Sequence, residues 1–308
     1  MVRLRFGVAL NLHRPETLLP LAEQVEALGY ESLWAGDHIS YTRPILDPLT
    51  LLASYAARTR RVRLGTCVYL LPLRHPTPVA KAVASLDFLS GGRVVFGVGV
   101  GGEFPKEFEA CGVPREERGR RTDEGIEVLR RLWRDSPASF EGKHFRFDGV
   151  TIEPKPAQPG GPPILVGGRS DFALRRAGRL GDGWISYLVA PDRYRRSLDK
   201  IEGFAAEAGR RLERFEPAHL TFIAMDDDPE TARETAARHL TRRYDQPFDE
   251  LVERYCVLGP PEACAERIAA FAEAGVETFV LNFVVDSQRE AEQIEAFAAE
   301  VLPRFRSG

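Results

Sequence analysis

An aspartate and a histidine, Asp37 and His38, directly follow the apolar run in "YESLWAG". An imidazole can donate or accept a proton near neutral pH, and the end of a buried strand is a common place for catalytic groups. His38 is therefore a candidate for acid–base chemistry, and a purely structural histidine is the alternative.

A glycine pair in "ILVGGRSDFALRRAG" offers a second kind of chemistry. Gly167 and Gly168 end an apolar run, and a helical pattern begins near Ser170. Absent side chains let the backbone approach a phosphate, to which Arg169 adds charge and Ser170 a hydroxyl. The stretch predicts a phosphate site, and a tight turn capped by Ser170 is the alternative.

The stretch "VVFGVGVGGEF" matches the dinucleotide pattern GxGxxG letter for letter. That pattern has its physical meaning only where the last glycine opens a helix within one strand–turn–helix unit, and "EFP" follows here instead. Gly97, Gly99 and Gly101 lie at alternate positions on one face of a strand end, which leaves room for a flat ring. Gly99, Val100 and Gly101 are thus candidate cofactor contacts, with backbone crowding inside a barrel as the alternative.

Strand and helix patterns alternate along the whole chain and must position these residues. The expected strands are "RLRFGVAL", "YESLWAGDH", "RVRLGTCVYL", "RVVFGVGVG", "PPILVGG", "DGWISYL", "PAHLTFIAM" and "ETFVLNFV", and each is followed by a helical pattern. With no linker between halves, this predicts an α/β fold in which residues 1–308 form a single (β/α)8 TIM barrel. Residues 137–162 break the rhythm and predict a hairpin insertion after the fourth βα unit.

Composition excludes several function classes. The formal net charge is −3, from 42 basic and 45 acidic residues, so nothing electrostatic favours a nucleic acid or a membrane surface as partner. The four cysteines lack metal or CxxC spacing, which predicts free thiols and no metal site. Without a signal-peptide pattern we expect a cytoplasmic protein. No hydrolase, P-loop or zinc motif is present, so a bound cofactor should carry any difficult chemistry.

Several segments in their order resemble the luciferase-like monooxygenase superfamily, specifically its deazaflavin-dependent oxidoreductase branch. They are "LWAGDHI", "RVRLGTCVYLLPLRHPTPVAKAVASLDFLSGGRVVFGVGVG", "ERGRRTDEGIEVLRRLW", "FEGKHFRFDGVTIEPKPAQPGGPPILVGG" and "RAGRLGDGW". The resemblance implies a (β/α)8 barrel that binds coenzyme F420, or alternatively FMN, with its ring at the carboxyl-terminal mouth. It also implies a homodimer that acts on a small-molecule substrate.

The resemblance also assigns residues. It places Asp37 and His38 beside the ring, and the phosphate on Gly167, Gly168 and the amides that follow. It implies a non-prolyl cis peptide between Cys67 and Val68, in a bulge that supports the rear face of the ring.

Two positions depart from relatives that act on glucose 6-phosphate. Thr42 and Gly102 stand where those proteins have a tryptophan and a glutamate, so that substrate is not expected. The absence of a large side chain at Gly102 opens the substrate side, where Glu103 could take a polar role. His13, in "NLHRPE", could reach the same mouth, although a solvated loop histidine is the alternative.

The expected function is therefore hydride transfer between F420 and a small organic substrate, with His38 orienting or protonating the reacting centre. The rival functions are an FMN-dependent monooxygenase and a non-catalytic barrel that binds a flavin or deazaflavin.

Overall fold

A closed parallel barrel forms the centre of the computed structural model, which describes residues 3–11 and 13–306. The pairings β9–β10 and β1–β12 close the sheet, as expected from the sequence. Its main strands are β1 (Arg5–Ala9), β2 (Ser32–Ala35), β3 (Arg63–Thr66), β5 (Val94–Gly99), β8 (Ile164–Gly167), β9 (Gly183–Tyr187), β10 (Glu216–Met225) and β12 (Thr278–Phe283). Two short strands, β4 (Tyr69–Leu70) and β11 (Val257–Gly259), extend its rim.

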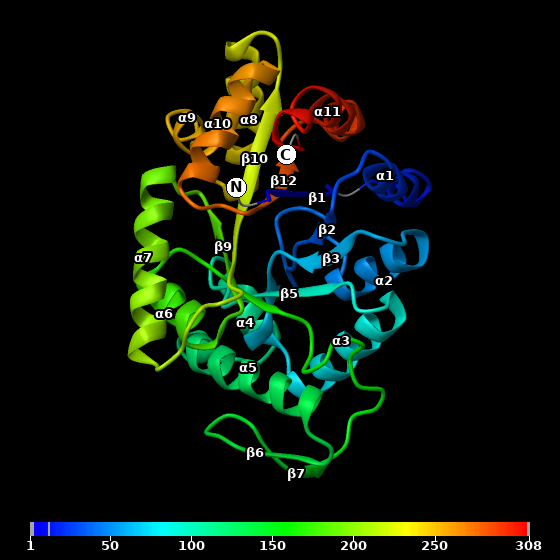
Figure 1. Ribbon diagram of the computed structural model, residues 1–308, viewed down its shortest axis with the longest axis vertical. Coiled ribbons are helices and arrows are strands. Elements are labelled where there is room, and N and C mark those ends of the chain that lie inside the picture. Colours follow the sequence, from blue (N-terminus) through cyan, green and yellow to red (C-terminus); the bar gives the residue numbers. More distant parts are fainter. Residues whose placement is uncertain (1–2, 12, 307–308) are drawn as a thin grey trace.

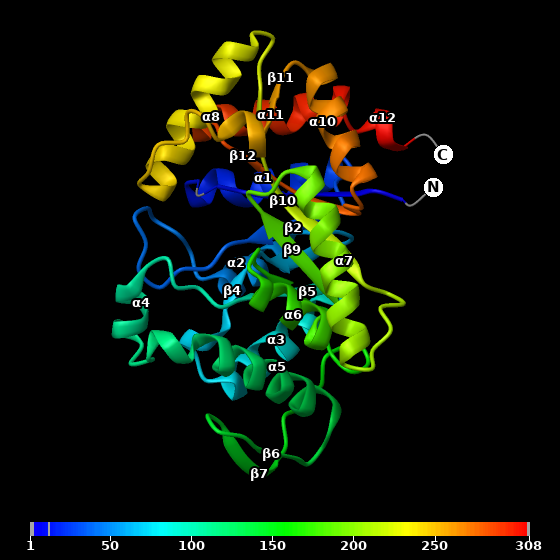
Figure 2. The same cartoon turned by 90° about the vertical axis from the view of Figure 1, so that its left-hand side faces the viewer.

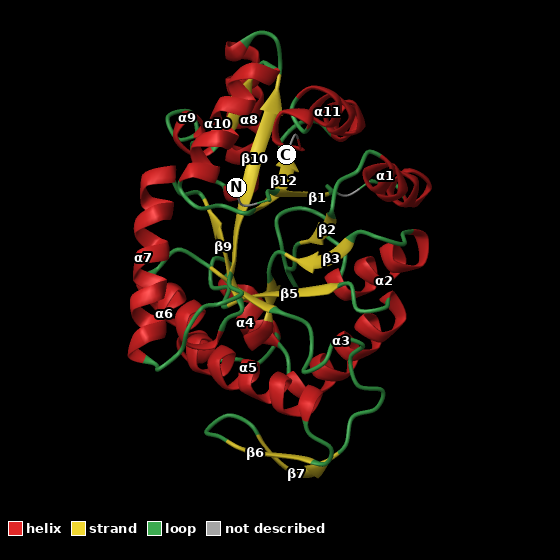
Figure 3. Cartoon of the chain, in the orientation of Figure 1, coloured by secondary structure: helices red, strands yellow, loops and turns green. Residues whose placement is uncertain are grey.

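Helices surround the barrel on the outside (Figures 1 and 3). They are α1 (Pro15–Ala27), α2 (Pro48–Arg58), α3 (Pro76–Ser90), α4 (Pro105–Ala110), α5 (Arg118–Arg134), α6 (Asp171–Leu180), α7 (Pro191–Glu207), α8 (Pro229–Tyr244), α9 (Val252–Tyr255), α10 (Pro261–Glu273), α11 (Ser287–Glu300) and α12 (Pro303–Arg306), with 3-10 turns η1 (Leu71–Leu73) and η2 (Arg115–Glu117). Many of them begin at a proline, whose fixed φ suits the first helical position. None of the described helices is long and apolar enough to cross a membrane.

The expected hairpin insertion is present as β6 (Ala138–Glu141) and β7 (Arg146–Val150), which pair antiparallel. It lies beyond α5 at one end of the molecule (Figures 1 and 2). In Figure 2 the amino-terminal strand runs from right to left, so the carboxyl ends of the strands face the side on which α4 lies. Because the hairpin lies beyond α5, outside the ring of barrel strands, it is away from the centre of the barrel mouth.

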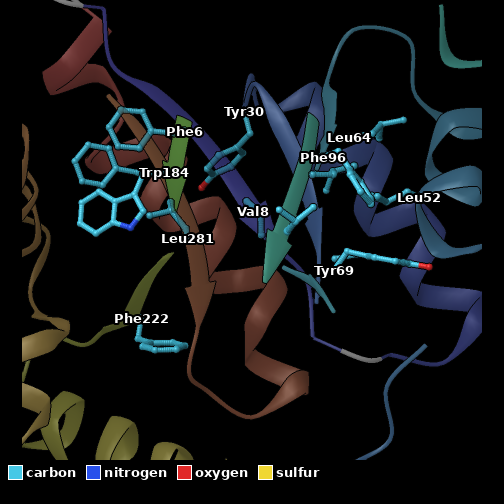
Figure 4. Packing of buried hydrophobic residues seen from close by; sticks show 14 of the residues in the cluster. Phe6, Val8, Tyr30, Leu52, Leu64, Tyr69, Phe96, Trp184, Phe222 and Leu281 are labelled. Carbon is cyan, nitrogen blue, oxygen red and sulfur yellow. The ribbon is translucent and has the colours of Figure 1, made fainter. Parts of the chain in front are cut away.

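The barrel interior and the layer between strands and helices form distinct apolar clusters. In the outer layer, Phe6 on β1 stacks on Phe279 at 5.2 Å between ring centroids, and Figure 4 shows the packing around it. Inside the barrel, Trp34 is fully buried and its indole N–H donates to Ser32 Oγ at 2.8 Å. A Cβ on Gly65 would lie 2.1 Å from the Trp34 ring, so the glycine makes room for this side chain.

A buried histidine on β10 makes stability depend on pH. His219 lies against Ser186 Oγ at 2.6 Å and stacks on Phe271, and its Nε2 has no partner among the described residues. Burial, helped by Arg267, lowers its pKa from 6.5 to about 3. Between these values the unfolded chain binds a proton that the folded chain does not, so stability falls as pH falls below 6.5.

We expect His219→Gln to flatten this acid dependence. From pH 6.5 to pH 5 the buried histidine costs the wild type about 2 kcal/mol of unfolding free energy, and the variant lacks that loss. Urea unfolding at pH 7 and pH 5 measures the difference. His75→Gln, which changes an exposed histidine, serves as control. Equal pH slopes for wild type and His219→Gln would contradict the prediction.

Candidate active site

A cavity of about 260 Å³ opens at the carboxyl ends of the strands, the place where (β/α)8 barrels bind their ligands. Residues from all eight βα units surround it. The lining residues include Asp37, His38, Tyr41, Arg43, Ile45, Leu46, Val68, Gly99, Val100, Gly101, Gly102, Glu103, Glu107, Gly167, Gly168, Tyr187, Arg243, Tyr244 and Asn282. Within the described ranges, no group of three or more histidine, cysteine or acidic side chains is arranged to hold a metal ion.

A bulge after β3 forms the floor of the cavity. The peptide between Cys67 and Val68 is cis, as the family resemblance implies. Val68 packs on the apolar cluster inside the barrel and also lines the cavity. A Cβ on Gly99 would lie 2.4 Å from the Val68 side chain, and a Cβ on Gly167 would lie 2.6 Å from it. These two glycines therefore make room for Val68.

This corrects one part of the sequence interpretation of the glycine-faced strand. The space beside Gly97 is filled by the barrel itself, because a Cβ there would lie 2.0 Å from the Thr66 carbonyl oxygen. The space at Gly99 holds Val68 rather than an open slot for a ring. Gly99, Val100 and Gly101 nevertheless line the cavity, so their contact with a cofactor stays a prediction.

Asp37 fixes the floor in place. Its buried carboxylate accepts from the Leu70 amide at 2.8 Å and from both Nη atoms of Arg74 at 2.6 and 2.9 Å. A bidentate guanidinium pair of this kind is both strong and directional. Asp37 lines the cavity, but its oxygens are committed to holding the β2–α2 loop against the bulge.

His38 is held by a buried glutamate on α4. Its Nδ1 lies 3.2 Å from an oxygen of Glu107, whose side chain is 1% exposed. The same carboxylate accepts from the amides of Ile39 at 2.7 Å and Ser40 at 3.2 Å. The imidazole also stacks on Tyr41 at 4.0 Å between centroids. Nε2 of His38 has no partner among the residues that the structure describes, so it is free to meet a ligand.

We expect Glu107→Gln to loosen this loop. The amide keeps one oxygen but loses the charge that accepts from His38 and two backbone N–H groups, and charge-assisted hydrogen bonds contribute about 1.5–3 kcal/mol each. Because His38 is then poorly oriented, kcat should fall about 10-fold or more while cofactor binding changes little. Steady-state kinetics and cofactor titration separate these effects.

Glu109→Gln, an exposed change on the same helix, is the matched control. Unchanged kcat in Glu107→Gln, or an equal loss in both variants, would contradict the positioning role.

The expected phosphate site lies where β8 turns into α6. Gly167 and Gly168 line the cavity, and Gly168 has a φ of +126°, a conformation that favours glycine. Within the described chain, the amides of Arg169 and Ser170 donate to no acceptor, which is the arrangement that suits an anion at a helix N-terminus.

Two further residues of this segment are occupied elsewhere. The Ser170 hydroxyl accepts from the Ala173 amide as the N-cap of α6. The Arg169 guanidinium donates to the Leu188 carbonyl at 3.1 Å and lies over the Tyr187 ring. Neither residue lines the cavity, so a contact of Arg169 or Ser170 with a cofactor stays a prediction.

His13 lies apart from the cavity lining. It pairs with Glu290, whose carboxylate also accepts from Asn11. Gly102 has a φ of +112°, which favours glycine, and a Cβ there would lie 3.0 Å from Arg118 Nε, so that side chain would have to shift slightly. Glu103 does line the cavity and accepts from the Tyr187 hydroxyl at 2.9 Å. Burial, together with the Glu103 charge, raises the pKa of Tyr187.

Sequence reasoning missed several residues of the cavity. Tyr41, Arg43 and Arg243 line it, and Glu107 holds His38. Arg43 and Tyr41 follow His38 within one loop, so their nearness in sequence was a usable signal. Arg243 ends α8 far along the chain, and nothing in its neighbourhood marks it.

The chain is a (β/α)8 barrel with a cavity at the carboxyl ends of its strands, where proteins of this fold bind their ligands. The family model described as luciferase-like monooxygenase matches residues 4–278, and the chain belongs to that family.

Relatives within the family carry different activities. The chain is 31% identical over 320 residues to 4-hydroxyprotoasukamycin monooxygenase of Streptomyces nodosus subsp. asukaensis, covering 93% of this chain and 86% of the relative. It is 28% identical over 333 residues to F420-dependent glucose-6-phosphate dehydrogenase of Nakamurella multipartita, covering 99% and 97%. The fold is similar to that of an F420-dependent secondary alcohol dehydrogenase in complex with an F420–acetone adduct, with a TM-score of 0.87, 24% identity and coverage of 99% and 100%.

Proposed function

We propose that this protein is an oxidoreductase that transfers hydride between coenzyme F420 and a small organic substrate at the barrel mouth. The observation that carries the proposal is the presence, in one cavity, of His38 with a free Nε2 and of the glycine turn that opens α6. F420-dependent relatives support the choice of cofactor.

The residues present fit such a cofactor. The free amides of Arg169 and Ser170, beside Gly168, would hold its phosphate at the N-terminus of α6. The turn needs glycine at position 168, because a Cβ there would lie 2.8 Å from the Ala173 side chain. Val68 and the strand end at Gly99 would support the ring. When bound, F420 would supply the hydride-accepting carbon. His38 Nε2 would hold or move a proton at the substrate oxygen, and the apolar walls would exclude water.

The experiment that tests the proposal is a cofactor titration followed by turnover. Purified protein is mixed with F420 or FMN, unbound ligand is removed, and the absorbance spectrum identifies what stays bound. Retention of F420 with anaerobic turnover of its oxidised or reduced form against a panel of alcohols, ketones and enones supports the proposal. Retention of neither cofactor would sink it.

The alternative is an FMN-dependent monooxygenase, which the monooxygenase relative favours. Oxygen consumption with reduced FMN and a substrate, absent with F420, would select it. A barrel that binds a cofactor without turning over any substrate is the third possibility, and retention of a cofactor with no turnover across the whole substrate panel would favour it.

A further inference from the structure

Two arginines, Arg43 from the β2–α2 loop and Arg243 from the end of α8, line the same cavity. No carboxylate among residues 3–11 and 13–306 lies within 4.0 Å of either guanidinium. Other partly buried arginines are paired with a carboxylate, as Arg74 is with Asp37, or donate to backbone carbonyls, as Arg93 and Arg210 do. Partly buried positive charges without a counter-ion are costly, which points to an anion that arrives with a ligand.

Both arginines are held in place by neutral groups. Arg243 Nη1 donates to Asn282 Oδ1 at 2.6 Å, and Asn282 in turn donates to the Ala9 carbonyl at 2.8 Å. Arg43 Nη1 lies 3.2 Å from His239 Nε2, and Arg43 Nε is buried without a partner among the described residues.

The neighbouring histidine does not balance the charge. Burial, together with the arginine charges, lowers the pKa of His239 to about 4, so its imidazole is neutral at physiological pH and accepts from Arg43. Burial and the nearby Arg243 lower the pKa of Arg43. The two guanidinium groups thus repel each other and gain from a shared anion.

The acids of the cavity are committed elsewhere. Asp37 is held by Arg74, Glu107 by His38 and backbone amides, and Glu103 accepts from Tyr187. Ile45 and Leu46, which follow Arg43 in the same loop, line the same cavity and are large apolar side chains that remain exposed.

We propose that Arg43 and Arg243 form a subsite for the carboxylate or phosphate of an organic anion whose apolar body lies against Ile45 and Leu46. The proposal rests on the proposed function in that the anion is the substrate of the oxidoreductase. Guanidinium groups bind both oxyanions with paired hydrogen bonds, and an apolar wall selects ligands that carry a hydrophobic part as well.

Isothermal titration calorimetry with 2-naphthoate, 2-naphthyl phosphate and neutral 2-naphthamide tests the proposal. The titrations use the protein with and without its bound cofactor. We expect at least one anion to bind the loaded protein about 10-fold or more tighter than the amide. Arg43→Gln and Arg243→Gln should each reduce this preference about 10-fold or more, and Arg43→Lys should retain part of it.

Arg242→Gln is the matched control, because Arg242 precedes Arg243 on α8, is exposed and carries the same charge. It should keep the full preference for the anion. Circular dichroism confirms that each variant is folded. Equal affinity for anions and amide, or an equal loss in Arg242→Gln, would overturn the proposal.

Binding of the anion to the free protein but not to the loaded one would also overturn it, because the arginines would then serve the acidic groups of the cofactor. Failure of the proposed function is seen separately, as the absence of F420 and FMN binding in the absorbance spectrum. Discrimination between anion and amide can still be measured in that case.

Discussion

His38→Asn should lower kcat by about 100- to 10,000-fold while leaving cofactor affinity within about threefold of the wild type. Asparagine can keep a hydrogen bond to Glu107 through its amide, so the loop stays in place, but it neither donates nor accepts a full proton at the former Nε2 position. The loss should therefore appear in kcat rather than in KM. Single-turnover absorbance of the cofactor, measured at several pH values, follows the reacting step directly.

The matched control is His75→Asn. His75 caps α3 through the Thr77 amide and is exposed, away from the cavity. It should change stability slightly and turnover not at all. A His38→Asn variant with wild-type turnover would remove His38 from the reaction, and a parallel loss in His75→Asn would show a general effect of unfolding.

Gly168→Ala should weaken cofactor binding about 100-fold or more. The added Cβ would lie 2.8 Å from the Ala173 side chain, and alanine strongly disfavours a φ of +126°. The turn must shift, which moves the free amides of Arg169 and Ser170 away from the phosphate position. Binding measured by absorbance after removal of unbound ligand gives the Kd.

Gly91→Ala supplies the control for backbone strain. Gly91 ends α3 with a φ of +71°, and a Cβ there meets nothing within 4 Å. It should lose about 1 kcal/mol of stability and keep its cofactor affinity. Cofactor binding by Gly168→Ala at wild-type strength would place the phosphate elsewhere in the cavity.

The barrel could be predicted from the sequence because its signals are local. Each strand is a short apolar run and each helix an amphipathic one, and many helices start at a proline. The hairpin was marked by glycines and prolines between two alternating segments. His38 and the glycine turn at Gly168 were found in the same way, since they directly follow strands whose ends meet at one mouth.

The features that the sequence did not reveal depend on contacts between segments that are distant along the chain. Gly97 and Gly99 were interpreted as space for a ligand, whereas they make room for Thr66 and Val68. A period-two pattern shows which face lacks side chains, but not what fills that face. Glu107 lies 69 residues from His38 in sequence, so no spacing rule connects them.

Arg243 illustrates the same limit from the other side. Its helix shows an ordinary mixture of charges, and it reaches the cavity because α8 ends above the barrel next to Asn282 of β12. An arginine points to a bound anion only where no carboxylate lies near it in the folded chain, and sequence spacing does not show which side chains lie near it.

Val68 lies at the boundary between the packed interior of the barrel and the cavity. Below it, Trp34, Val95 and Leu165 fill the barrel, and above it the cavity begins. Val68, which occupies the space left by Gly99 and Gly167, is therefore one of the residues that limit how far a ligand can enter the barrel. The packed barrel interior and the cavity share only a few residues, Val68 among them, so substitutions in the loops around the cavity should change ligand binding without disturbing the packing inside the barrel.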